Sequence, residues 1–134
     1  MRKNNPPYNL AGLPLAELIK KADQTRKKYC GKRLDLCTIM NAKSGTCSEN
    51  CKFCAQSAHH ASGIETYPLK NKDEIVKSAR KAKELGSQRF GIVTSGNRLT
   101  DKEIGIVADA VREIKRDVGM IVCASLGELS EKDL

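Results

Sequence analysis

Apolar residues recur along this chain at two different spacings, and each spacing predicts a different type of element. Helical spacing, with apolar positions three or four apart, covers residues 14–30, 71–86 and 100–119. Pro14 can begin the first of these helices and Gly31 can end it. Short continuous apolar runs predict strands over residues 34–40, 89–94 and 120–124.

Polar pairs at a fixed spacing mark the points where helices begin. The pattern is a small polar residue followed three positions later by an acid, as in a capping box, where each side chain binds the other residue's backbone N–H. It occurs at Asn71 with Glu74, at Thr100 with Glu103 and at Ser130 with Asp133. The first two pairs support helices predicted above, and the third predicts a helix start near the end of the sequence.

The order of these elements predicts an α/β fold, because alternating strands and helices imply parallel strands joined by crossover helices. The second and third strands begin about 31 residues apart, whereas the first interval is longer by about 23 residues. The excess is a loop after the first strand, at the strand end where parallel sheets and barrels carry functional residues. Three strands cannot close a barrel, so we expect the N-terminal part of a longer protein, with a helical lead-in over residues 1–31 and the sheet over residues 32–134.

Three cysteines in eight residues of that loop, Cys47, Cys51 and Cys54, are the main candidates for chemistry. A thiolate triad this close can hold one face of an iron–sulfur cluster, which normally takes four thiolates. Without a fourth protein ligand, one iron keeps an open position where a small molecule can be activated. A structural zinc site of the Cys₃His type, completed by His59 or His60, is the alternative at this point, although paired histidines are more often loop residues than ligands.

The composition narrows the class of protein. The formal net charge is +8, but basic residues are spread among acids, Trp is absent and aromatic content is 4%, so we expect no nucleic-acid partner. No apolar stretch has the length of a signal peptide or a membrane span, so we expect a cytoplasmic protein with no membrane partner. In that reducing compartment, six cysteines favour metal ligands and free thiols over disulfides.

The string NAKSGTCSENCKFCAQSAHH, residues 41–60, resembles the signature loop of the biotin synthase family. That family belongs to the radical S-adenosylmethionine (radical SAM) superfamily, whose CxxxCxxC motif has an aromatic residue before the last cysteine, and Phe53 fills that place. The resemblance extends to the strings ADQTR, SGIETYPL, RFGIVTSG and IVCASLGEL, so it covers the chain from about residue 13 onward.

This resemblance implies the first strand–helix units of a TIM-type (β/α)8 radical SAM barrel, incomplete in this chain. It implies that Cys47, Cys51 and Cys54 hold a [4Fe–4S] cluster, which binds S-adenosylmethionine, and that Phe53 presents its backbone to the adenine. The implied reaction is radical-driven insertion of sulfur into dethiobiotin to form biotin. An electron donor such as flavodoxin or ferredoxin and a second copy of the full-length chain are the implied partners.

The family also implies an auxiliary iron–sulfur cluster, [2Fe–2S] or a variant, and here the sequence departs from the best-known members. Those carry a cysteine on the second strand where this chain has Gly91, although the third-strand cysteine is present as Cys123. Cys37 stands on the first strand where those members have serine, and it can face the barrel interior. We hypothesise that Cys37 and Cys123 both bind an auxiliary cluster of altered type. The alternative is that both are buried thiols with no ligand role, and Cys30 is expected to be incidental.

Two other functions stay open from the sequence. One is a different radical SAM enzyme, such as a hydrogenase-maturation or methylornithine-forming relative, which would share the triad but not its flanking strings. The other is a small zinc-binding interaction module. We also expect the 134 residues alone to be inactive, because an unclosed barrel cannot shield a radical.

Overall fold

The computed structural model describes residues 10 and 12–133, whose contacts divide the chain into two units, Met1–Leu34 and Asp35–Leu134. The described part of the first unit contains helix α1, Leu15–Cys30, with Pro14 before it and Gly31 after it, as predicted. None of the side chains of α1 is buried. No helix in the described part of the chain is both long and apolar enough to cross a membrane.

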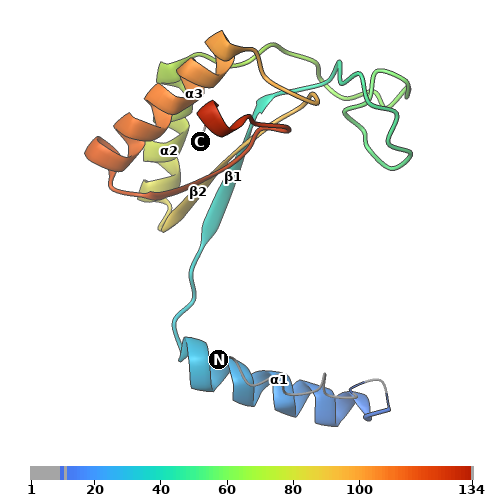
Figure 1. The fold of residues 1–134 in the computed structure, drawn as a ribbon. Coiled ribbons are helices and arrows are strands. Elements are labelled where there is room, and N and C mark those ends of the chain that lie inside the picture. Colours follow the sequence, from blue (N-terminus) through green and yellow to red (C-terminus); the bar gives the residue numbers. More distant parts are fainter. Residues whose placement is uncertain (1–9, 11, 134) are drawn as a thin grey trace. The chain divides into compact units, whose positions relative to one another are not determined.

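The second unit is a parallel three-stranded sheet with two helices on one face (Figure 1). The strands are β1 (Cys37–Lys43), β2 (Arg89–Thr94) and β3 (Ile121–Ser125), and they lie side by side in that order. The connecting helices are α2 (Lys72–Glu84) and α3 (Asp101–Glu113). The predicted α/β alternation with parallel strands is therefore confirmed.

The bounds of β1 and of α3 differ most from the prediction. β1 begins at Cys37 rather than at Leu34 because backbone pairing, and not apolarity, sets its start: the first carbonyl that β2 contacts is that of Leu36. The α-helical part of α3 ends at Glu113, and the chain continues in one π-helical turn, η1 (Ile114–Val118), up to Gly119 in the left-handed conformation.

The core lies between the sheet and the two helices. Phe90 and Ile92 of β2 are fully buried on the helix side of the sheet. They pack in one cluster with apolar residues of α2, α3 and their flanking turns: Ile75, Val76, Ala79, Ala82, Leu99, Val107, Ala110 and Ile114. Alternate strand residues face the other way. On that side Ile39 and Ile121 are 67% and 54% exposed, so the described residues of the second unit leave this face of the sheet uncovered.

Two of the three predicted capping boxes are present. The Asn71 side chain accepts from the N–H of Glu74 at 2.9 Å, and the Thr100 hydroxyl accepts from the N–H of Glu103 at 3.3 Å, with the reciprocal bonds also formed. At the third predicted start, Ser130 donates its N–H and its hydroxyl to Asp133, and a single 3₁₀ turn, η2 (Glu131–Asp133), follows.

Replacing Thr100 with alanine is expected to lower the free energy of unfolding by about 1 kcal/mol, because the first turn of α3 loses its cap. Urea denaturation followed by circular dichroism measures the change. Lys102→Ala is the matched control, since it shortens an exposed side chain in the same turn without touching the cap. Equal losses in the two variants would contradict the capping role of Thr100.

Candidate metal centre

The long loop between β1 and α2, residues 44–71, starts at the carboxyl end of β1, as predicted. Ser95, which follows β2, donates its N–H to the carbonyl of Lys43 at 2.9 Å and its hydroxyl to the carbonyl of Gly45 at 2.7 Å. Gly45 has φ 76°, and a Cβ there would collide with the Thr66 side chain. The direction in which the loop leaves the sheet is thus fixed by contacts that only glycine accommodates without strain.

The loop is closed at its base by Tyr67. Ser44 and Tyr67 exchange two backbone hydrogen bonds, both of 3.1 Å. The Tyr67 hydroxyl donates to the carbonyl of Asn41 at 2.9 Å, and the N–H of Lys70 donates to the carbonyl of Ala42 at 2.8 Å. Both ends of the loop are therefore held against the last residues of β1.

Gln56 ties the middle of the loop to this base. Its side-chain carbonyl accepts from the N–H of Gly45 at 2.6 Å and from the Ser44 hydroxyl at 3.3 Å. Its backbone carbonyl accepts from the N–H of Cys47 at 3.0 Å, and the carbonyl of Cys47 accepts from Ala58 at 2.8 Å. Cys47 is therefore held on both sides of its backbone.

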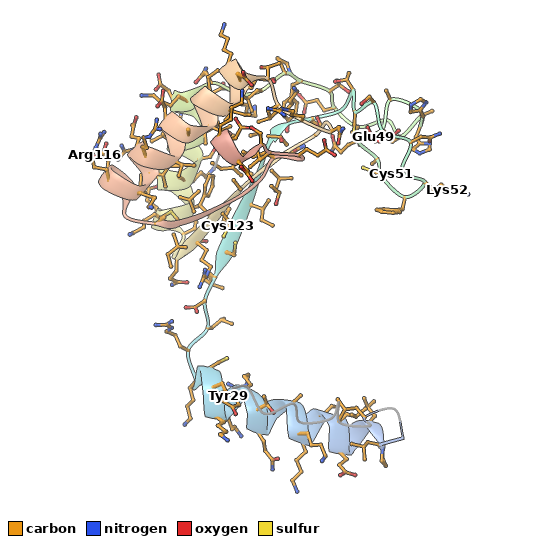
Figure 2. The ribbon with its side chains drawn as sticks, viewed as in Figure 1. Tyr29, Glu49, Cys51, Lys52, Arg116 and Cys123 are labelled. Carbon is orange, nitrogen blue, oxygen red and sulfur yellow. The ribbon has the colours of Figure 1, made fainter. Side chains whose placement is uncertain are left out.

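The three predicted cluster ligands sit on one loop at three levels of exposure. Cys47 is buried, Cys54 is partly buried and Cys51 is exposed, and the N–H of Cys54 donates to the carbonyl of Cys51 at 3.0 Å in a β-turn. Phe53, between them in sequence, is 95% exposed. Figure 2 shows Cys51 on this loop, well away from Cys123 on the sheet.

The donor chemistry of the loop fits an iron–sulfur cluster, because three soft thiols are carried by one short segment. In residues 10 and 12–133, no three His, Cys, Asp or Glu side chains are gathered closely enough to hold a metal ion. The ligand role of Cys47, Cys51 and Cys54, like the adenine contact of Phe53, therefore stays a prediction.

The two histidines bind the backbone of the cysteine loop. His59 Nε2 lies 3.0 Å from the carbonyl oxygen of Ser48, and His60 Nε2 lies 3.1 Å from that of Cys51. Sequence reasoning left both rings without a role, because a bond from a side chain to a backbone carbonyl has no characteristic spacing. The only signal available was the density of polar side chains in residues 57–62, SAHHAS.

The two candidate auxiliary ligands share the uncovered face of the sheet. Cys123 of β3 is in register with Gly91 of β2 and, through it, with Ile39 of β1. Cys37 lies two positions before Ile39 and so faces the same side. Both thiols are exposed. Gly91 carries no side chain, and that of Ile39 lies against its backbone.

Lys43 and Glu103 form an ion pair at the root of the loop, with Nζ and Oε1 2.7 Å apart and both side chains about four-fifths buried. Burial acts to raise the pKa of the Glu103 carboxyl, but hydrogen bonds from Lys43 and Thr100 outweigh it and hold the pKa below its usual range. One acid thus links the loop root to the cap of α3.

Comparison with known proteins identifies the superfamily of the chain. The sequence profile of the radical SAM superfamily matches residues 42–134, which include the whole cysteine loop. The chain belongs to the radical SAM superfamily. Its parallel α/β sheet forms the first strand–helix units of the TIM-type barrel of this superfamily, which confirms the predicted fold.

Individual relatives carry a more specific name. The chain is 48% identical to a biotin synthase of Thermotoga petrophila over 118 residues, which are 88% of this chain and 38% of that protein. It is 46% identical to biotin synthase 2 of Corynebacterium diphtheriae over 93% of this chain and 38% of that protein. A biotin synthase of Akkermansia muciniphila is 45% identical over 89% of this chain and 37% of its own length. The chain therefore spans little more than a third of these curated relatives.

Replacing Lys43 with methionine is expected to flatten the acid dependence of stability. Glu103 has a lowered pKa in the folded protein, so its contribution is present above the unfolded value, about 4.3, and is lost as the pH falls through the folded pKa. Without Lys43 the two pKa values approach each other and less stability is lost over that window. Urea unfolding at a series of acidic pH values measures this.

Lys21→Met is the control for the lysine variant, because Lys21 pairs with Glu17 at 3.9 Å with both side chains 48% exposed, and such pairs contribute little. If the free energy of unfolding of Lys43→Met changes with pH in the same way as that of the unchanged protein, the ion pair does not set the pKa of Glu103.

Proposed function

We propose that the protein containing this chain is a biotin synthase, which inserts sulfur into dethiobiotin in a reaction dependent on S-adenosylmethionine. The observation that carries the proposal is the cysteine triad on the loop after β1, within a sequence 45–48% identical to three biotin synthases over most of this chain. The activity belongs to the whole protein, of which this chain corresponds to little more than a third in its relatives.

The residues of the loop have distinct tasks in this proposal. Cys47, Cys51 and Cys54 hold a [4Fe–4S] cluster and leave one iron open to S-adenosylmethionine, whose adenine lies against the backbone of Phe53. When bound, these two groups supply the radical that takes hydrogen from dethiobiotin. Gln56 and Tyr67 hold the loop on the sheet, so the thiols stay at the end of the strands where the substrates enter.

In this proposal the inserted sulfur comes from an auxiliary cluster on the uncovered face of the sheet. Cys123 and Cys37 bind an auxiliary iron–sulfur cluster, and Cys37 replaces the ligand that Gly91 cannot provide. Two exposed thiols on one face of the same sheet support this arrangement. The remaining ligands come from residues outside this chain.

The partners follow from the same reaction. A small electron-transfer protein of the flavodoxin or ferredoxin type reduces the first cluster, and the full-length protein forms a homodimer. A cytoplasmic location suits this chemistry, since a reducing compartment keeps the free thiols available for iron. The 134 residues alone are expected to be inactive.

The test of the function uses the full-length protein, reconstituted with iron and sulfide without oxygen. Cleavage of S-adenosylmethionine that depends on dethiobiotin, together with formation of biotin, is the expected result. Cleavage that is independent of dethiobiotin would assign the protein to another radical SAM reaction. A colourless protein containing zinc would overturn the radical mechanism itself.

Replacing Cys47, Cys51 or Cys54 with alanine in that protein is expected to remove the [4Fe–4S] cluster, about four irons, and to abolish cleavage. Iron analysis and the electron paramagnetic resonance (EPR) spectrum of the reduced cluster measure the loss. Cys30→Ala is the matched control, because Cys30 is exposed on α1 and outside the loop. Retention of the full cluster in any of the three triad variants would rule out that cysteine as a ligand.

Replacing Cys123 or Cys37 with alanine is expected to reduce the iron content while the EPR signal of the first cluster remains. The sulfur-insertion product should be lost, because its sulfur source is missing, whereas cleavage of S-adenosylmethionine continues. An unchanged iron content in the Cys37 variant would show that Cys37 is not a ligand. The iron content of the Cys123 variant tests Cys123 separately.

A further inference from the structure

Residues 57–62 are here called the donor segment, and residues 47–55 the cysteine segment. Four side chains of the donor segment bind backbone carbonyls of the cysteine segment. The contacts are Ser57 Oγ to Glu49 at 2.6 Å, His59 Nε2 to Ser48 at 3.0 Å, His60 Nε2 to Cys51 at 3.1 Å and Ser62 Oγ to Ala55 at 2.7 Å. Every one of these acceptors lies between or beside the three cysteines. One short segment therefore fixes the orientation of four peptide groups in the other.

The protonation of both rings follows from these contacts. A carbonyl oxygen can only accept a hydrogen bond, so Nε2 of His59 and Nε2 of His60 must each carry a hydrogen. In the neutral ring this leaves Nδ1 without a proton. The rings thus act as directed donors, and a side chain that offers an N–H at the same position can replace them.

The orientation of the peptide groups matters for a cluster. The carbonyls of Ser48, Glu49 and Cys51 are bound to the donor segment, and the N–H groups on the same three peptides, those of Glu49, Asn50 and Lys52, have no acceptor among the described residues. Hydrogen bonds to cluster sulfur are one of the main determinants of reduction potential. Residues that orient ligands also affect metal retention strongly.

We propose that His59 and His60 are positioning residues for the cluster: by donating Nε2–H to the carbonyls of Ser48 and Cys51, they fix the peptide groups around the triad and leave its N–H groups free for sulfur. The proposal rests on the proposed function as far as the cluster is concerned. Neither ring is a ligand in it, which separates it from the zinc alternative.

The first measurement compares leucine and glutamine at each histidine in the reconstituted full-length protein. His59→Leu and His60→Leu remove the donor, and each is expected to release iron to a chelator about tenfold faster and to shift the midpoint of the reductive EPR titration. His59→Gln and His60→Gln should behave like the unchanged protein, because the glutamine amide can place an N–H near the position of Nε2.

Glu65→Leu is the matched control, since it places leucine on the same loop at an exposed position without a contact to the cysteine segment. Leucine variants with unchanged iron release and unchanged midpoint would overturn the proposal. Glutamine variants that fail as badly as the leucine variants would overturn it as well, because the donated hydrogen would then not be the cause.

The second measurement separates this proposal from the proposed function, because it uses the metal-free full-length protein. Long-range proton–nitrogen NMR above the ordinary imidazole pKa, about 6.5, should show a protonated Nε2 and an unprotonated Nδ1 in both rings. Hydrogen exchange at the N–H groups of Cys47 and Cys54, which donate to the carbonyls of Gln56 and Cys51, should be about fivefold faster in the leucine variants, because one hydrogen bond that opposes opening of the loop is lost. A protein that passes these tests but takes up no cluster contradicts the proposed function alone, whereas the opposite tautomer or unchanged exchange contradicts the positioning role.

Discussion

The parallel pairing of β1 with β2 is the constraint on which the rest of the second unit depends. Its register places Thr38 beside Phe90 and Met40 beside Ile92, so these residues face the helices together, and Met40, Phe90 and Ile92 form one side of the core. The ladder becomes irregular between Asn41 and Lys43 and ends there. Because Ser95 follows β2 directly, it reaches the first residues of the loop at the same point, and the loop is anchored where the strands stop.

The same register separates two kinds of surface. One face of the sheet is occupied by α2 and α3 (Figure 1), whereas Ile39, Ile121, Cys37 and Cys123 lie exposed on the other. Parallel sheets are normally covered on both faces. The exposed apolar side chains and the two thiols to which we assign a cluster therefore lie on the same face. Any part of the protein that buries these apolar side chains will also enclose the thiols. Gly91 in the middle strand has no side chain of its own there, and the side chain of Ile39 lies against it.

The sequence predicted best what short-range interactions determine. The caps at Asn71 and Thr100 were predictable because each is formed between residues three positions apart. The bounds of β1 were not, since the apolar run over residues 34–40 is displaced by three residues from the stretch 37–43 that β2 pairs with. The π turn that extends α3 to Val118 left no pattern that distinguishes it from an ordinary helical turn.

In the cysteine loop, the sequence predicted the ligand chemistry but not the contacts that shape the loop. Three cysteines at close spacing were visible as candidate ligands, and a resemblance to a known family named the cofactor. The ring contacts of His59 and His60 were not visible, because their partners lie eleven and nine positions away and are backbone atoms. Residue type reports donor chemistry directly, whereas the shape of a loop is determined by contacts that leave little trace in the sequence.

The residues that hold the cysteine loop in place lie close to it in the sequence, and this affects when the loop can form during synthesis. Its contacts with Asn41, Gln56, Tyr67 and Ser95 all join residues numbered between 41 and 95. The bond from Ser95 to Gly45 closes 50 residues of chain, and it needs no residue after Ser95. During synthesis on the ribosome, the loop can therefore acquire its shape as soon as β2 has emerged, before α3 and β3 exist. A metal site in this position can be prepared while most of the protein that will enclose it is still being translated.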